Sequence, residues 1–230
     1  LFRSISQVSP HATQSLGRSF NRLWSASIAS NLADGILQIS AGLLALTLTR
    51  NPVLISMMPA LMMLPWLLFA IPIGGLVDRV NRRKLLSFSN MVRAGLGACL
   101  ALLIATHSLT IGFLYVFVFL SGICEVIIDT TSQAMIPKLL DKNNFERANA
   151  RLQISESVIS GCIGAPISSF LFAAAVALPF VFTSSGYAVA ALMIFLIPLH
   201  ALNGNESAKQ GESQSRSEEH TSELQSPCNL

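Results

Sequence analysis

Long stretches without charged residues are the feature that most restricts the fold of this chain. Three of them lack any Asp, Glu, Lys or Arg: 27 residues after Arg50, 31 after Arg93 and 49 after Glu156. A helix needs about 20 apolar residues to cross a bilayer, so the longest stretch holds two such helices. Only 12% of the 230 residues are charged, whereas soluble domains carry roughly 25%. The sequence therefore predicts an all-α, polytopic membrane protein, and not a disordered chain, a disulfide scaffold or a β-barrel.

Six membrane-spanning helices are expected from the apolar runs. They cover approximately residues 24–48, 54–77, 85–106, 110–132, 152–175 and 178–200. The connections after the first and third helices are very short. The second connection, 78–84, and the fourth, 133–151, contain several charged residues.

The basic residues are distributed unevenly between the two ends of these helices. Twelve Lys and Arg residues fall on one side, namely before the first helix, in the second and fourth connections, and after the sixth helix. Arg50 alone falls on the opposite side, and Arg93 lies within a helix. Since cytoplasmic loops carry the excess of positive charge, both chain ends are expected in the cytoplasm.

The two ends of the chain are expected to flank the helical region 24–200. We expect a cytoplasmic segment over 1–23 and a cytoplasmic linker over 201–215. The chain begins with Leu1 and not Met, so its true start is expected upstream. The last 15 residues, 216–230, read RSEEHTSELQSPCNL and resemble a translated sequencing-adapter oligonucleotide. This tail is therefore expected to be non-native, and a natural polar cytoplasmic tail is the alternative.

A polar stripe lies on one face of the first helix. It consists of four residues spaced 4, 3 and 4 apart: Ser27, Asn31, Asp34 and Gln38. A carboxylate at mid-bilayer costs a few kcal/mol, so it normally faces a protein interior or an aqueous cavity. The stripe therefore indicates an aqueous path through the bundle. The alternative is that its amide and hydroxyl groups only bind a neighbouring helix.

Four further charged residues lie in or near the expected spans: Arg93, Glu125, Asp129 and Glu156. Arg93 lies about two turns inside the third helix and either extends towards the cytoplasm or pairs with a carboxylate. Glu125 lies one turn deeper than Asp129 on the same helix face. Asp129 and Glu156 are near enough to helix ends for interfacial positions. Burial in a low dielectric favours the protonated form of a carboxylate, which suggests proton coupling.

The second connection and its flanks carry an ordered pattern of glycine, acidic and basic residues. It reads GGLVDRVNRRK from Gly74 to Lys84. This pattern resembles the signature loop of the major facilitator superfamily, in which the loop latches two halves of a transporter. The glycines are expected to allow close helix approach. Asn81 replaces the usual Gly, and Asn tolerates the left-handed conformation better than most residues. The resemblance implies a conformational switch formed by Gly74, Gly75, Asp78, Arg79, Arg82 and Arg83.

Two further stretches resemble the macrolide- and enterobactin-exporter branch of that superfamily. Residues 129–137, DTTSQAMIP, are similar to Asp-Pro-Ala-Arg-Gln-Ala-x-x-Pro at the end of the fourth helix, with Ser132 in place of the Arg. The fifth helix is similar to a Gly-Pro-rich exporter motif at Gly161, Gly164 and Pro166. Ordinary tight helix packing is the alternative explanation for these small residues.

The resemblance covers about residues 20–199 and implies that the chain is the N-terminal half of a twelve-helix transporter. It implies a secondary-active exporter in the bacterial inner (plasma) membrane, which moves a small amphipathic drug or secondary metabolite outward as protons move inward. The implied partners are the lipid bilayer, the substrate, protons and the missing C-terminal half. The candidate substrate- or proton-binding residues are Asn31, Asp34, Gln38, Arg93 and Glu125.

Other functions remain open at this point. A siderophore, metabolite or lysolipid carrier has the same fold, because the pocket and not the fold selects the substrate. A non-transporting membrane fragment is a further alternative. A membrane enzyme is not expected, because the four histidines are isolated and lie outside the span centres. No cofactor, metal site or nucleic-acid partner is expected.

Overall fold

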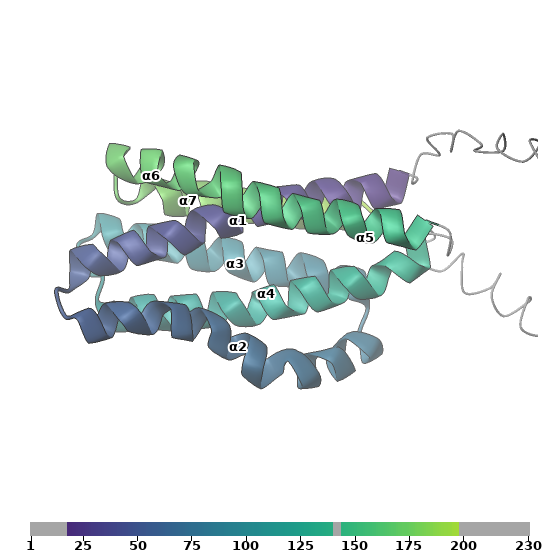
Figure 1. The fold of residues 1–230 in the computed structure, drawn as a ribbon, viewed down its shortest axis with the longest axis horizontal. Helices are drawn as coiled ribbons and strands as arrows, with labels where there is room; N and C mark the ends of the chain where they lie inside the picture. Colours follow the sequence, from purple (N-terminus) through teal and green to yellow (C-terminus); the bar gives the residue numbers. More distant parts are fainter. Residues whose placement is uncertain (1–17, 140–143, 198–230) are drawn as a thin grey trace, which may run out of the picture.

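The computed structural model of the protein describes residues 18–139 and 144–197. All regular structure in these residues is helical, and the helices run side by side as a bundle with connections at its two ends (Figure 1). Six helical stretches are long and apolar enough to cross a membrane, which confirms the expected all-α membrane fold. The predicted regions 201–215 and 216–230, and most of the segment 1–23, lie outside the described residues.

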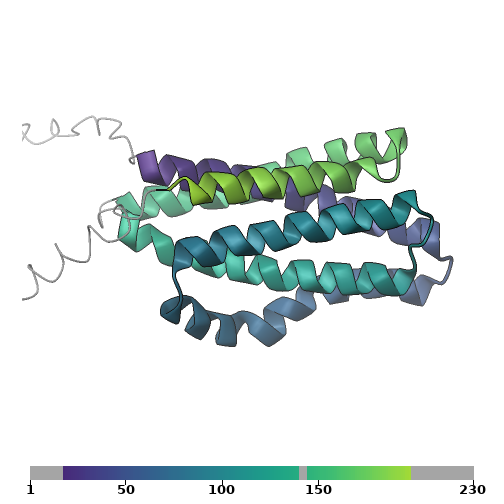
Figure 2. The same ribbon diagram turned by 180° about the vertical axis from the view of Figure 1, so that it is seen from behind.

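The structure divides these six stretches into eight helical segments: α1 (Arg18–Leu48), α2 (Pro52–Arg79), α3 (Arg82–Ala105), α4 (Ile111–Leu139), α5 (Phe145–Ile154), the π-helical segment η2 (Ser155–Gly164), α6 (Ala165–Ala174) and α7 (Leu178–Phe195). The segments α5, η2 and α6 together form the fifth span. The first and last described residues lie at the same end of the bundle (Figure 2). We call it the basic end, because it carries Arg22, Arg79, Arg82, Arg83, Lys84, Arg147 and Arg151.

Several helices extend beyond the predicted bounds, and the prediction of a long fourth connection over 133–151 is wrong. Helix α4 continues to Leu139 and α5 begins at Phe145. The apolar run gives only the part of a helix that crosses the bilayer, whereas Gln, Lys, Glu, Arg and Ala continue a helix readily outside it. As a result, Glu156 lies 11 residues into the fifth span and Arg93 lies 11 residues into α3, deeper than predicted.

Asparagine side chains cap the N-termini of two helices. Asn51 Oδ1 accepts a hydrogen bond from the Val53 N–H at 3.0 Å, and Pro52 occupies the first turn of α2. Asn81 Oδ1 accepts from the Lys84 N–H at 3.3 Å at the start of α3. Asn81 has φ −64° and ψ 106°, so the left-handed conformation considered for it is not adopted. An N-cap requires an extended backbone and a side-chain acceptor, and Asn supplies both.

Apolar packing at the two ends of the bundle encloses a polar layer between them. The core towards the basic end includes Leu23, Leu86, Met135 and Ile194. The core towards the opposite end includes Leu44, Leu100, Leu114 and Phe180. Each core takes residues from α1, α3, α4 and α7, and Asp34, Arg93 and Glu125 lie between the two levels along the chain. The apolar cores therefore position the helices that carry the charged groups.

Helix α1 and segment η2 approach each other closely at glycine residues. A Cβ atom added to Gly164 would lie 2.8 Å from the Gly35 Cα, and one added to Gly35 would lie 2.7 Å from the Ser160 Cα. Further along the same contact, the Ser40 and Ser168 hydroxyl groups are 2.7 Å apart. Gly161 is exposed, and a Cβ there would meet no atom within 4 Å. Tight packing against α1 therefore explains why Gly164 and Ser168 are small residues, but it does not explain the glycine at Gly161.

Helix α2 leaves much of its apolar surface uncovered. Leu67 is 82% exposed and Ile71 is 90% exposed. Gly74 and Gly75 lie on this helix, and a Cβ at either would meet no atom of the described residues within 4 Å. The expectation that these two glycines allow close helix approach is therefore wrong for the helices that the structure describes. The described bundle contains no neighbour for that surface of α2.

We predict that Gly164→Ala destabilises the bundle more than Gly161→Ala, although both glycines lie in the same π-helical segment. The new Cβ at position 164 meets the backbone of α1, which no rotamer change can relieve, and such overpacking costs about 1–3 kcal/mol. The measurement is the midpoint of thermal unfolding in detergent. Equal midpoints for the two variants would contradict the close contact between α1 and η2.

Candidate substrate and coupling site

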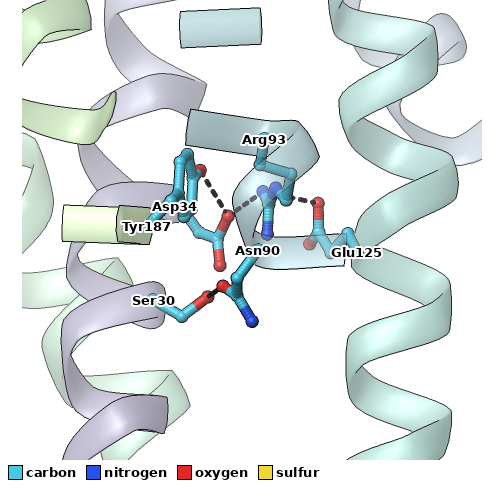
Figure 3. Close-up of polar contacts among 6 residues, drawn as sticks. All are labelled: Ser30, Asp34, Asn90, Arg93, Glu125 and Tyr187. Carbon is cyan, nitrogen blue, oxygen red and sulfur yellow. Dashed lines mark hydrogen bonds and ion pairs between the residues drawn. The ribbon is translucent and has the colours of Figure 1, made fainter. Parts of the chain in front are cut away.

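A buried guanidinium at the middle of the bundle connects three helices. Arg93 on α3 donates a hydrogen bond to Asp34 Oδ1 on α1, and the Tyr187 hydroxyl on α7 donates to the same oxygen at 2.8 Å (Figure 3). The guanidinium also lies over the Tyr187 ring, 4.2 Å from its centre. Arg93 and Tyr187 are each 1% exposed. Of the two predicted positions for Arg93, the structure contains the ion pair and not extension towards the bundle end.

Glu125 on α4 is the second carboxylate beside this guanidinium. Its Oε2 lies 3.8 Å from Arg93 Nη2, which is an ion pair too long for a hydrogen bond. Its side chain is 41% exposed, compared with 17% for the Asp34 side chain. Arg93 Nε and Nη1 have no hydrogen-bond partner in the described residues. The cluster therefore contains one cation and two carboxylates, and the second carboxylate is loosely bound.

This cluster borders a cavity of about 230 Å³, which we call the central cavity. Its polar wall includes Asp34 and Gln38 from the predicted stripe, together with Arg93 and Glu125. Its apolar wall includes Leu37, Met62, Met63, Trp66 and Val118. An apolar groove between α1 and α2 shares Gln38, Met62 and Met63 with it. The central cavity thus combines charged groups with a surface suited to an apolar ligand.

A second cavity, of about 250 Å³, lies closer to the basic end, and we call it the amide cavity. Its polar lining is rich in amide and hydroxyl groups: Ser27, Ser30, Asn31, Asn90, Ser132, Gln133, Asn149 and Gln153. Asp129 and Glu156 are its charged lining residues, and Glu156 also lines the central cavity. The predicted stripe on α1 therefore borders both cavities, and Asp129 and Glu156 face the bundle interior.

Sequence reasoning missed several residues of this region. Tyr187 is the polar aromatic residue of the mainly apolar helix α7, a signal that could have identified it. Ser30 Oγ donates to Asn90 Oδ1 at 3.4 Å, and Asn90 in turn donates to the Leu86 carbonyl at 3.0 Å. Ser121 Oγ is buried without a hydrogen-bond partner among the residues that the structure describes, and it lines the central cavity. These residues carry no charge, so the search for charges inside the spans did not detect them.

The predicted switch loop connects α2 and α3 to other helices at the basic end. Arg82 Nη2 lies 3.2 Å from Asp78 Oδ1, and Arg82 Nη1 donates to the Ala134 carbonyl of α4 at 3.0 Å. Arg83 donates to the Phe195 carbonyl and lies 5.0 Å from the centre of the Phe195 ring. Arg79 is exposed. The loop therefore joins α3 to α4 and α7 through arginine side chains.

A bundle of membrane-spanning helices around charged interior cavities is the architecture of a membrane transport protein. The family model of the Major Facilitator Superfamily matches residues 23–226, and the chain belongs to this superfamily of transporters, as its signature loop predicts.

Two curated relatives are similar to this chain. They are Macrolide efflux protein A of Streptococcus pyogenes and the protein of the same name from serotype M6 of that species. Each is 23% identical over 153 residues, which is 66% of this chain. The chain covers 38% of the length of these relatives. No solved structure matches the chain significantly.

We predict that Arg93→Met destabilises the protein by about 3–5 kcal/mol, because it leaves a buried carboxylate without its cation. Adding Asp34→Asn should recover part of this loss. The control is Arg82→Met on the same helix, since its partner Asp78 has a side chain that is 73% exposed. Such an exposed pair contributes about 0–1 kcal/mol. The measurement is unfolding by dodecyl sulfate in mixed micelles. Equal losses for the two arginine variants would refute the structural importance of the buried pair.

Proposed function

We propose that this chain is the N-terminal half of a secondary-active exporter, which moves a small amphipathic cation out of the cell in exchange for protons. The observation that carries the proposal is the central cavity, where Asp34 and Glu125 flank the single guanidinium of Arg93 and an apolar wall lies opposite. Carboxylates inside a membrane are costly and mark the pathways of substrates and protons.

The charges around both cavities favour a cationic substrate. The acidic lining residues are Asp34, Glu125, Asp129 and Glu156, whereas the basic lining residue is Arg93. A cavity lined by one sign of charge attracts ligands of the opposite sign. The apolar residues Met62, Met63 and Trp66 suit the apolar part of such a ligand. The same charge disfavours an anionic siderophore. The name of the relatives, a macrolide efflux protein, supports a drug-like substrate.

The direction of transport requires an orientation in the membrane, and we propose that the basic end faces the cytoplasm. The described arginine and lysine residues gather at that end, whereas Arg50 lies at the opposite end. The membrane is then the bacterial inner (plasma) membrane, as suits relatives from a streptococcus. In this orientation the switch loop lies on the cytoplasmic side.

A second six-helix half is part of the proposal. The chain covers 38% of the length of its relatives, and the exposed apolar surface of α2, with Leu67 and Ile71, offers a surface for that half or for lipid. Alternating access requires one half to move against the other around a shared site. The loop at Asp78 and Arg82 would release and re-form its contacts with α4 during that motion.

We predict that cysteine labelling in sealed cells distinguishes the two ends. In a background with Cys99, Cys124, Cys162 and Cys228 replaced by Ala, Lys84→Cys should resist a membrane-impermeant maleimide. Ser108→Cys, at the opposite end, should react. Both positions are exposed, so the lipid barrier alone separates them. Permeabilised cells are the control, in which both cysteines should react. The reverse pattern in sealed cells would overturn the orientation.

The transport proposal is tested in proteoliposomes with an imposed pH gradient. We expect no saturable erythromycin flux from residues 1–230 alone, because the proposed second half would supply the rest of the cavity wall. Flux should appear when the chain is co-reconstituted with a second six-helix half, sought in the genomic sequence after Gln210. Saturable flux from the chain alone would show that six helices suffice, and pH-independent flux from the complete transporter would refute proton coupling.

A further inference from the structure

We propose that a proton and a lipophilic cation compete for the carboxylate of Glu125, whereas Asp34 remains the fixed counter-ion of Arg93. This inference rests on the proposed proton-coupled export and assigns its exchange step to one residue. It differs from the simplest interpretation of the sequence, in which Asp34, the acidic residue of the polar stripe, carries the proton.

The contacts of Asp34 oppose its participation in exchange. Its Oδ1 accepts hydrogen bonds from both Arg93 and the Tyr187 hydroxyl, which lie on different helices. Both donors hold this oxygen in place, and a proton or a ligand on it would compete with each hydrogen bond. A cation that displaced Arg93 would deprive the guanidinium of the one carboxylate that it hydrogen-bonds, although Arg93 is only 1% exposed. Replacement of a buried ion partner is strongly unfavourable.

Glu125 has the opposite properties. Its carboxylate lies 3.8 Å from Arg93 Nη2, beyond hydrogen-bond distance, and its side chain is 41% exposed. Arg93 Nε and Nη1 are buried without partners in the described part of the chain, so the guanidinium has donors left for an ionised Glu125. Glu125 therefore has two available positions: bonded to Arg93, or turned into the central cavity towards a ligand. Figure 3 shows it on the far side of the guanidinium from Asp34.

The charge of the cluster makes this an exchange of one proton for one monovalent cation. Arg93 neutralises Asp34, so Glu125 supplies one negative charge that either a proton or one monovalent cation can neutralise. The protonated acid carries no charge, so proton binding releases the cation and cation binding releases the proton. The remaining titratable groups around Glu125 come from α1, α3, α7, η2 and α4 itself: Asp34, Arg93, Tyr187, Glu156, Cys124 and Asp129. Helix α2 contributes uncharged side chains to the cavity.

The cavity next to Glu125 suits a lipophilic cation. Trp66, Met62 and Met63 of α2 line it together with Glu125. An indole ring attracts cations through its electron-rich face, and methionine side chains adapt to ligands of different shapes. Ser121 lies one turn before Glu125, and its buried hydroxyl has no partner among the described residues. It is a free hydrogen-bonding group on the cavity wall.

The test is binding of tetraphenylphosphonium to the 230-residue chain in nanodiscs, measured from pH 5 to pH 8 by quenching of tryptophan fluorescence. Trp66→Phe shows whether the signal comes from the cavity, since Trp24 is the other tryptophan. In the unmodified chain, we expect the affinity to fall by up to about tenfold per pH unit at acid pH, as competition with one proton requires. Glu125→Gln should bind the probe weakly at every pH.

Matched variants separate Glu125 from the other carboxylates. Glu146→Gln, an exposed glutamate of α5, should bind as the unmodified chain does. Asp129→Asn and Glu156→Gln should each retain pH-dependent binding, because Glu125 and its balance of charge with Asp34 and Arg93 are intact. Asp34→Asn should bind the probe weakly, because Arg93 then neutralises Glu125. Pure size-exclusion profiles show that the variants are folded, and if Asp34→Asn fails this criterion, the Glu125→Gln result still decides.

Three results would overturn the proposal. They are pH-dependent binding that persists in Glu125→Gln, pH dependence lost in Asp129→Asn or Glu156→Gln, and no probe binding to the unmodified chain. The proposed function is tested separately, because binding is measured without a gradient or a second half. Proton-coupled flux with unchanged pH dependence in Glu125→Gln would refute only this assignment. Intact pH-linked binding without proton-coupled flux would refute only the exporter.

Discussion

The burial of the Arg93 guanidinium is the constraint on which the rest of this structure depends. A cation at the centre of a membrane bundle is stable only if an anion and hydrogen-bond acceptors surround it. Asp34 supplies the anion, and Tyr187 holds the same carboxylate from the other side. The pair therefore determines how α1, α3 and α7 are rotated relative to one another. The apolar cores above and below it, which contain Leu44 and Leu86 among others, hold the helices at that level.

The same constraint explains why the candidate substrate site lies beside the pair. Once Asp34 and Arg93 neutralise each other, any further carboxylate nearby introduces a charge that the bundle does not balance. Glu125 is that carboxylate, and the central cavity gives it access to a ligand. A hydrogen-bonded pair that joins two helices and a longer pair, which we propose responds to protons or substrate, thus share one guanidinium. Rigid packing at Gly35 and Gly164 keeps η2, which carries Glu156, close to this region.

The contacts at the basic end show how a movement near the cavity can reach the switch loop. Arg82 binds Asp78 and a carbonyl of α4, the helix that also carries Glu125 and Asp129. Arg83 binds the end of α7, the helix that carries Tyr187. A change in the position of either helix would therefore alter the contacts of the loop. This is a physical link between the two regions that the sequence motifs identify separately.

The sequence by itself determined the spanning helices, the superfamily and the set of interior charges. These depend on local properties: an apolar run long enough for a bilayer, an ordered loop motif, and a charged residue inside a span. The partners of those charges depended on the tertiary structure. Asp34 and Arg93 are 59 residues apart, and Tyr187 is 153 residues from Asp34. Helical periodicity assigns residues to a face, but it does not specify the depth and rotation of one helix against another. For the same reason, only the structure distinguished Gly164, which contacts α1, from Gly161, which does not.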